Sequence, residues 1–130
     1  MNVIFVEYPG YSIYEDKKQE PKQIYDDSLV VFDWLNNLKI DKSNIFIYGR
    51  SLGTSPAIYL SSKIQPKALF LLSAFTSIKD IGSDKFCCLL VEDIFASIHY
   101  INFVKCPVLL IQGENDYAIS YIYSQKLKKF

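Results

Sequence analysis

Residues 48–53 read Tyr-Gly-Arg-Ser-Leu-Gly and place Ser51 between two glycines, in the pattern G-x-S-x-G. The pattern lies between a short apolar run and a stretch of helical character. A serine on such a sharp strand-to-helix turn projects its hydroxyl above the sheet, where it can act as a nucleophile. Gly49 and Gly53 are expected there because the strand and the helix would pass too close together to leave room for a Cβ.

The neighbours of the serine have predicted roles in the same turn. The helix N-terminus would direct free N–H groups toward negative charge, so the amide of Leu52 is the predicted oxyanion donor. Arg50 is the single arginine of the chain, and it could contact an acidic group at the site or simply pair with a surface carboxylate. The alternative for the whole pattern is a glycine-flanked turn that happens to contain a serine.

A serine hydroxyl needs a base near neutral pH, and the base needs a carboxylate to hold its tautomer and stabilise the imidazolium. Asp116 is the candidate carboxylate, because it follows a short apolar run that ends at the edge where open parallel sheets bind ligands. Asp116 could instead cap the segment that follows it. Glu114, in the same turn, is an alternative for the same role.

The chain contains one histidine, His99. It precedes Asp116 and lies beside Tyr100 and Ile101, where a lone histidine is more often packed or half-exposed than catalytic. It would act as the base only if its segment folded down to bring the imidazole within about 3 Å of Ser51 Oγ. One histidine and no Cys-x-x-Cys leave too few ligands for zinc, so we expect no metal and no cofactor.

The elements that must position these residues follow the pattern of an α/β fold. Short β-rich runs alternate with longer segments of helical period, which predicts a parallel sheet with helices on both faces. The predicted strands are residues 3–7, 45–48, 68–72 and 108–112. Because residues 45–48 are continuously apolar, we expect them to form a central strand covered on both faces.

The predicted helices are residues 21–38, residues 54–63 and a final segment from about Ser120. In the first helix, apolar residues at spacings of seven, four and three predict one face that packs on a sheet. They are Ile24, Val31, Leu35 and Leu38. Residues 86–90 and 94–101 are candidates for short helices, although periodicity alone does not settle their structure.

The composition excludes several classes of protein. With half of its 130 residues apolar and 22% charged, the chain is typical of a globular domain rather than a disordered one. Its 14 basic residues balance 14 acidic ones, so no overall charge attracts nucleic acid, and we expect no nucleic-acid partner. There is no apolar run long enough to span a bilayer and no signal-peptide pattern, and the three cysteines suit reduced thiols, so we expect a cytoplasmic protein.

Four segments, in order along the chain, resemble successive signatures of the α/β-hydrolase superfamily. They are residues 5–11, 47–54, 73–77 and 106–116. Within the superfamily they look closest to the eukaryotic hydrolase-domain proteins that include acyl-protein thioesterases, or depalmitoylases. The resemblance implies that Ser51 is the nucleophile, Asp116 the triad acid and Leu52 one oxyanion donor. It also implies that residues 74–103 form a short cap-like insertion between the third and fourth strands.

The same resemblance implies parts that this chain does not contain. The triad of the superfamily follows the order serine, acid, histidine, and none of the 14 residues after Asp116 is a histidine. The second oxyanion donor would come from a loop ahead of the first strand, and a strand would be missing between residues 3–7 and 45–48, leaving unpaired edges. We therefore expect residues 1–130 to be a partial hydrolase domain that is inactive, or nearly so, alone.

The expected function is hydrolysis of an ester, thioester or amide through an acyl-serine intermediate, with protein depalmitoylation as one thioester case. Peripheral association with a membrane would depend on segments outside this chain. The rival from another class is a noncatalytic binding or scaffold protein that retains the hydrolase fold. A nucleotide-binding domain is disfavoured, because both glycine-rich phosphate-binding motifs are absent. A downstream histidine and an upstream His-Gly loop in the full-length transcript would favour the enzyme.

Overall fold

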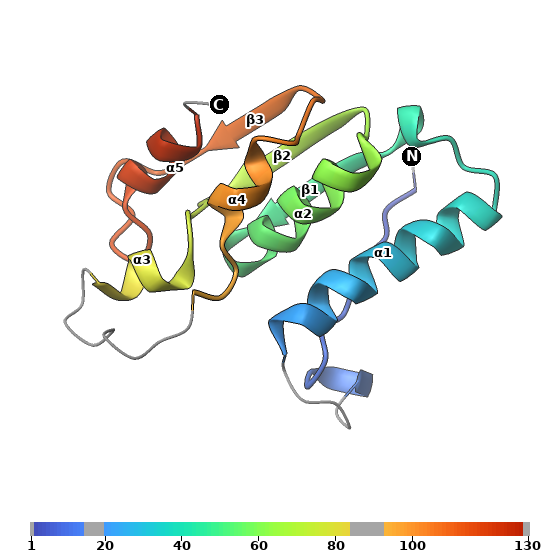
Figure 1. Cartoon of the computed structure of the whole chain (residues 1–130), viewed down its shortest axis with the longest axis horizontal. Helices are drawn as coiled ribbons and strands as arrows, with labels where there is room; N and C mark the ends of the chain where they lie inside the picture. Colours follow the sequence, from blue (N-terminus) through green and yellow to red (C-terminus); the bar gives the residue numbers. More distant parts are fainter. Residues whose placement is uncertain (1, 15–19, 84–92, 129–130) are drawn as a thin grey trace. The chain divides into compact units, whose positions relative to one another are not determined.

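The structure is a computed structural model that describes residues 2–14, 20–83 and 93–128. The chain divides into two compact units, residues 1–40 and residues 41–130, which are both drawn in Figure 1. All the residues predicted to do chemistry belong to the second unit.

The first unit contains the helix α1 (Pro21–Asn37), which confirms the predicted helix. It begins with a proline, whose fixed φ suits the first helical turn and whose missing N–H has no intrahelical acceptor there. Ile24 and Leu35 are buried and Val31 is half-buried, as the spacing predicts. Leu38 is exposed, because the helix ends before it and Leu38 forms the C-cap.

The predicted strand at residues 3–7 is not formed. This segment is irregular, and the side chains of Val3 and Phe5 are exposed. A strand requires ladder hydrogen bonds to a neighbour, and the described residues of the first unit contain no strand that could pair with this segment. The segment leads into a turn at Gly10, whose φ is 83°, and then into the 3-10 turn η1 (Ser12–Tyr14).

The second unit contains a three-stranded parallel sheet, and its strands, in spatial order, are β1 (Phe46–Arg50), β2 (Ala68–Leu72) and β3 (Val108–Ile111). Arg50 pairs in register with Leu72, and Leu72 with Ile111, so the three strands end at one edge of the sheet. The arrowheads in Figure 1 point the same way. The predicted parallel α/β fold is confirmed.

The prediction that residues 45–48 form a central strand is wrong. β1 lies at one side of the described sheet, and β2 is the strand with a neighbour on each side. Phe46 and Tyr48 are 56% and 61% exposed, whereas Gly49, which points to the opposite face, is buried. The continuous apolar run therefore reflects aromatic side chains on an exposed face rather than a strand covered on both faces.

Helices complete the described part of the second unit, namely α2 (Thr54–Ile64), α3 (Ile78–Ser83), α4 (Ser97–Ile101) and α5 (Tyr121–Leu127), with the 3-10 turns η2 (Lys42–Asn44) and η3 (Ser51–Gly53). α2 packs against β1, β2 and α4. α5 begins where predicted, because Ser120 Oγ accepts a hydrogen bond from the Ile122 amide as an N-cap. None of the described helices combines the length and the apolar character needed to cross a bilayer.

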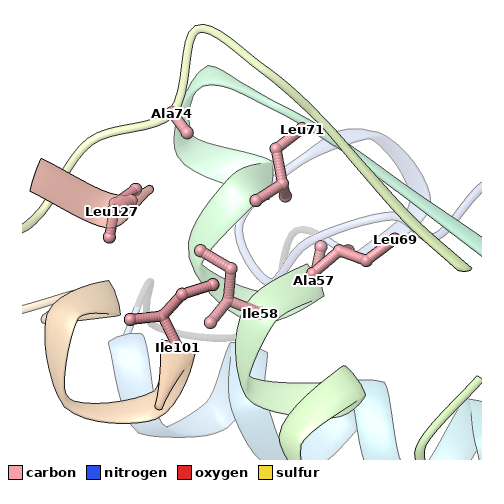
Figure 2. Close-up of a cluster of buried hydrophobic side chains, with 7 residues drawn as sticks. All are labelled: Ala57, Ile58, Leu69, Leu71, Ala74, Ile101 and Leu127. Carbon is pink, nitrogen blue, oxygen red and sulfur yellow. The ribbon is translucent and has the colours of Figure 1, made fainter. Parts of the chain in front are cut away.

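The core of this unit lies between α2 and one face of the sheet. Figure 2 shows its buried cluster, which consists of Ala57, Ile58, Leu69, Leu71, Ala74, Ile101 and Leu127. Ile58, Leu69 and Leu71 have no exposed surface, and burying each such side chain stabilises the fold by about 1.5–3 kcal/mol. The core therefore fixes α2 against the sheet, and with α2 the turn that precedes it.

The predicted insertion at residues 74–103 is described in part. α4 confirms a helix within residues 94–101. The other candidate helix, residues 86–90, which includes Cys87 and Cys88, lies outside the described residues. The cap-like role of the insertion stays a prediction.

Candidate active site

Ser51 directly follows β1 and opens the turn η3, which continues into α2. Its φ is 49°, in the left-handed region, where a residue other than glycine costs about 1–3 kcal/mol. The serine is exposed at the edge of the sheet where the strands end. The predicted arrangement of strand, serine and helix is therefore present, with backbone strain at the serine itself.

Gly49 is the position where the strand and the helix come too close for a side chain. A Cβ at this buried residue would lie 2.5 Å from the carbonyl oxygen of Gly53 and 2.8 Å from both Thr54 Cα and Ala57 Cβ. Two of these three atoms are backbone and cannot rotate away. The steric prediction for Gly49 is confirmed, whereas the corresponding prediction for Gly53 stays a prediction.

The start of α2 is held against the serine by a side-chain hydrogen bond. Thr54 Oγ1 donates to the carbonyl oxygen of Ser51 at 2.6 Å, and Thr54 is fully buried. Leu52 is half-buried inside η3, in the turn that begins the helix. The first amides of a helix carry partial positive charge, which makes this turn a suitable place for a developing oxyanion. The role of the Leu52 amide stays a prediction.

Asp116 lies between β3 and α5, and its carboxylate accepts four hydrogen bonds. Oδ1 accepts from the backbone amides of Ala118 at 2.9 Å and Ile119 at 3.0 Å. Oδ2 accepts from Ser73 Oγ at 3.0 Å and Gln112 Nε2 at 3.2 Å. An ionised carboxylate offers about four lone-pair positions, so these donors fully satisfy it.

These hydrogen bonds favour the charged form of the carboxylate. The bond from the Ile119 amide is the largest cause, and with the bond from the Ser73 hydroxyl it lowers the pKa of Asp116 below its ordinary value. The group is therefore ionised at neutral pH, which is the state required of a carboxylate that orients a histidine.

The lowered pKa of Asp116 predicts a contribution to acid denaturation. A carboxyl group whose pKa is lowered by folding stabilises the folded state. This stabilisation is fully present above the unfolded-state pKa of about 3.9 and is lost as the pH falls through the lower folded-state pKa. We expect Asp116→Asn to flatten this part of the pH dependence, as measured by urea unfolding from neutral to strongly acidic pH. Asn115→Ala, at an exposed and uncharged position of the same loop, is the control and should leave the profile unchanged. A wild-type profile in the Asp116→Asn protein would contradict the hydrogen-bond assignment.

A polar network anchors the Asp116 loop to the rest of the sheet. Gln112 Nε2 also donates to the Ile119 carbonyl oxygen at 2.9 Å, and Gln112 Oε1 accepts from Ser124 Oγ at 2.8 Å. Ser124, which is buried on α5, also lies within hydrogen-bond distance of the Ala74 carbonyl oxygen, at 3.3 Å. Gln112, directly after β3, is therefore linked to the Asp116 loop and to α5, and Ser124 links α5 to the segment that follows β2.

Sequence reasoning did not identify Ser73 and Gln112 as site residues. Each directly follows a strand, β2 or β3, and position at the end of a parallel strand was the available signal. Ser73 also opens one of the four segments that carry the family resemblance. Which strand-end side chains contact Asp116 depends on the path of the loop after Gln112, which the sequence does not specify.

Ser51, Ser73 and Asp116 follow three adjacent strands, so the structure brings them to one edge of the sheet. Because neighbouring strands lie about 4.8 Å apart, β1 and β3 are separated by roughly 10 Å, with β2 between them. The other two candidate residues, His99 and Glu114, are both exposed. His99 lies on α4 and is not among the groups hydrogen-bonded to Asp116.

Several curated proteins that are similar to the chain carry α/β-hydrolase names. The chain is 34% identical over 125 residues to the alpha/beta hydrolase domain-containing protein aho-3 of Caenorhabditis elegans, a match that covers 92% of this chain and 36% of the relative. It is 30% identical over 132 residues to the human alpha/beta hydrolase domain-containing protein 17B, covering 97% of this chain and 44% of the relative. The chain thus spans less than half of the length of these relatives. No family model matches it.

Two solved structures with the same fold are named as peptidases. A puromycin-hydrolyzing peptidase of Mycobacterium tuberculosis superposes with a TM-score of 0.67 at 18% identity, over 82% of this chain and 19% of that one. An acylaminoacyl peptidase of Pyrococcus horikoshii superposes with a TM-score of 0.64 at 19% identity, over 84% of this chain and 21% of that one. The architecture of the described residues is that of the α/β-hydrolase fold.

Proposed function

We propose that the chain carries the nucleophile and the acid of a serine hydrolase that cleaves an ester, thioester or amide through an acyl-serine intermediate. The observation that carries the proposal is the strained, exposed Ser51 between β1 and α2, at the same sheet edge as an Asp116 carboxylate held by four donors. Similarity to proteins with α/β-hydrolase names supports it.

In the proposed reaction, Ser51 Oγ attacks the acyl carbonyl carbon while a base takes the hydroxyl proton. The amide of Leu52 donates a hydrogen bond to the oxyanion of the tetrahedral intermediate. The intermediate collapses, the leaving alcohol, thiol or amine receives the proton, and the acyl group stays on Ser51. Water then repeats the sequence and releases the carboxylic acid.

The base in this proposal is a histidine supplied from outside residues 1–130. Asp116 would accept a hydrogen bond from its imidazole, hold its tautomer and stabilise the imidazolium. His99, the single histidine of the chain, lies exposed on α4 and is not assigned this role. A thioester of an acylated protein is the finer substrate proposal, and it rests on the resemblance of the four sequence segments to acyl-protein thioesterases.

A fluorophosphonate probe tests the proposal in the chain itself, because an activated serine displaces the fluoride and forms a stable phosphonyl ester. We expect slow labelling of the folded chain alone. Added imidazole, which supplies the base, should accelerate labelling about tenfold or more. The acceleration should not exceed the rate enhancement of about 10²–10⁴-fold that is typical of a positioned general base. Heat-unfolded protein should not respond to imidazole.

The matched variants are Ser51→Ala, expected to lose the imidazole-dependent labelling, and Ser12→Ala, expected to retain it. A noncatalytic scaffold predicts that wild type and Ser51→Ala behave alike at every imidazole concentration. That equality would overturn the proposed function.

A further inference from the structure

The four donors to Asp116 differ in how firmly they are held. Two are backbone amides, of Ala118 and Ile119, whose positions follow from the fold of the loop. The third, the side-chain amide of Gln112, is fixed by its second hydrogen bond, to the Ile119 carbonyl oxygen, and by the hydrogen bond that its own oxygen accepts. The fourth, the hydroxyl of Ser73, turns about a single bond.

The backbone of Ser73 is nevertheless held in place. Its amide donates to the Ile111 carbonyl oxygen at 3.0 Å, which extends the ladder between β2 and β3 by one more bond. Its φ is 53°, so Ser73, like Ser51, has left-handed backbone geometry directly after a strand. Residues in such sparsely populated conformations concentrate at functional sites, where the surrounding structure must hold them.

Ser73 also lies on the side of Asp116 that matters for the proposed chemistry. It follows β2, the strand between β1, which leads to Ser51, and β3, which leads to Asp116. The oxygen that Ser73 contacts, Oδ2, therefore faces the middle strand, whereas Oδ1 is occupied by amides of its own loop. A base that joins Ser51 to Asp116 must approach from this same side.

We infer that Ser73 is a positioning residue that orients the carboxylate of Asp116 toward the base of a serine hydrolase, an inference that rests on the proposed function. Its hydroxyl holds Oδ2 before the base arrives and can rotate to share that oxygen with an imidazole N–H. Gln112 and the two loop amides keep the carboxylate in place during this exchange. All four donors are neutral groups, so the orientation does not depend on an ion pair. The lowered pKa of Asp116, to which the Ser73 hydrogen bond contributes, agrees with this role.

The test is a pH titration of the Asp116 side-chain carboxyl by carbon-13 NMR in the full 130-residue chain. Ser73→Gly removes the hydroxyl and suits a positive φ, so the backbone is not strained by the change. We expect the pKa of Asp116 to shift upward in Ser73→Gly. Ser73→Asn, which tolerates the left-handed region and restores an N–H donor, should shift it back toward the wild-type value.

Ser12→Gly is the matched control, because Ser12 also has a positive φ, of 46°, but lies in the first unit. It should leave the titration of Asp116 unchanged. An unchanged pKa in Ser73→Gly, or the same shift in Ser12→Gly, would overturn the inference.

The kinetics of fluorophosphonate labelling separate positioning from a merely structural role. With imidazole present, Ser73→Gly should lower the maximal labelling rate and leave the half-saturating probe concentration unchanged. The titration of Asp116 needs no catalytic turnover. The role of Ser73 and the proposed hydrolase function can therefore be rejected independently of each other. A shifted pKa without any labelling at Ser51 would reject the serine hydrolase, whereas normal labelling with an unshifted pKa would reject the role of Ser73.

Discussion

Replacing Ser51 with glycine is expected to abolish imidazole-dependent fluorophosphonate labelling and, at the same time, to stabilise the fold. Labelling should fall by about 10³-fold or more, because the nucleophile is lost and no neighbouring group replaces it. The free energy of unfolding should rise by about 1 kcal/mol, because φ of 49° is strained for serine and unstrained for glycine. The exposed Ser51 side chain leaves no cavity when it is removed.

The opposite signs of these two effects distinguish a strained nucleophile from an ordinary turn serine. Gel-based detection of the probe measures the labelling, and urea unfolding of the same protein preparations measures the free energy of unfolding. Ser12→Gly, at an exposed residue with φ of 46°, is expected to stabilise the fold to a similar degree while leaving the labelling intact. A Ser51→Gly protein that keeps its labelling, or that is less stable than wild type, would contradict the account.

Gly49→Ala is expected to destabilise the fold by about 3 kcal/mol, the upper part of the range for inserting a methyl group into a packed site. The new Cβ would lie 2.5 Å from the Gly53 carbonyl oxygen, and the Thr54 Cα would be 2.8 Å away. These close contacts can be relieved only if the start of α2 moves away from β1. Because Ser51 lies between these two elements, the same movement should remove the imidazole-dependent labelling.

Gly113→Ala is the matched control for this prediction. The nearest atom to its new Cβ would be Asp116 Cβ at 4.0 Å, an ordinary van der Waals distance, so the change should alter stability by no more than about 0.5 kcal/mol. Urea unfolding of the two variants beside wild type gives the comparison. Equal stability of Gly49→Ala and Gly113→Ala would show that the close approach of α2 to β1 is not required.

The sequence predicts the elements best where local chemistry is decisive. α1 begins at a proline that suits a first helical turn, β2 occupies the predicted residues 68–72, and Ser120 caps α5 near its predicted start. The turn at Ser51 is also predictable, because two glycines around a serine, between a strand and a helix, leave few other arrangements. Each of these signals is contained in a few adjacent residues.

Predictions that depended on distant partners were wrong or incomplete. Residues 3–7 have the composition of a strand, but the described residues of their own unit offer no strand to pair with. Phe46 and Tyr48 are apolar, which suggested burial, yet their exposure depends on what covers that face of the sheet. Asp116 was identifiable as a strand-end carboxylate, whereas its contact with Ser73 joins two chain segments that are 43 residues apart and leaves no pattern in the sequence.

The position of a covalent adduct shows directly whether Ser51 is an activated nucleophile. The folded 130-residue chain is treated with a fluorophosphonate probe in the presence of imidazole, digested, and mapped by tandem mass spectrometry. We expect one dominant phosphonyl adduct on Ser51, absent from the Ser51→Ala protein. An adduct distributed over several serines and tyrosines, or a dominant adduct at another residue, would contradict this expectation.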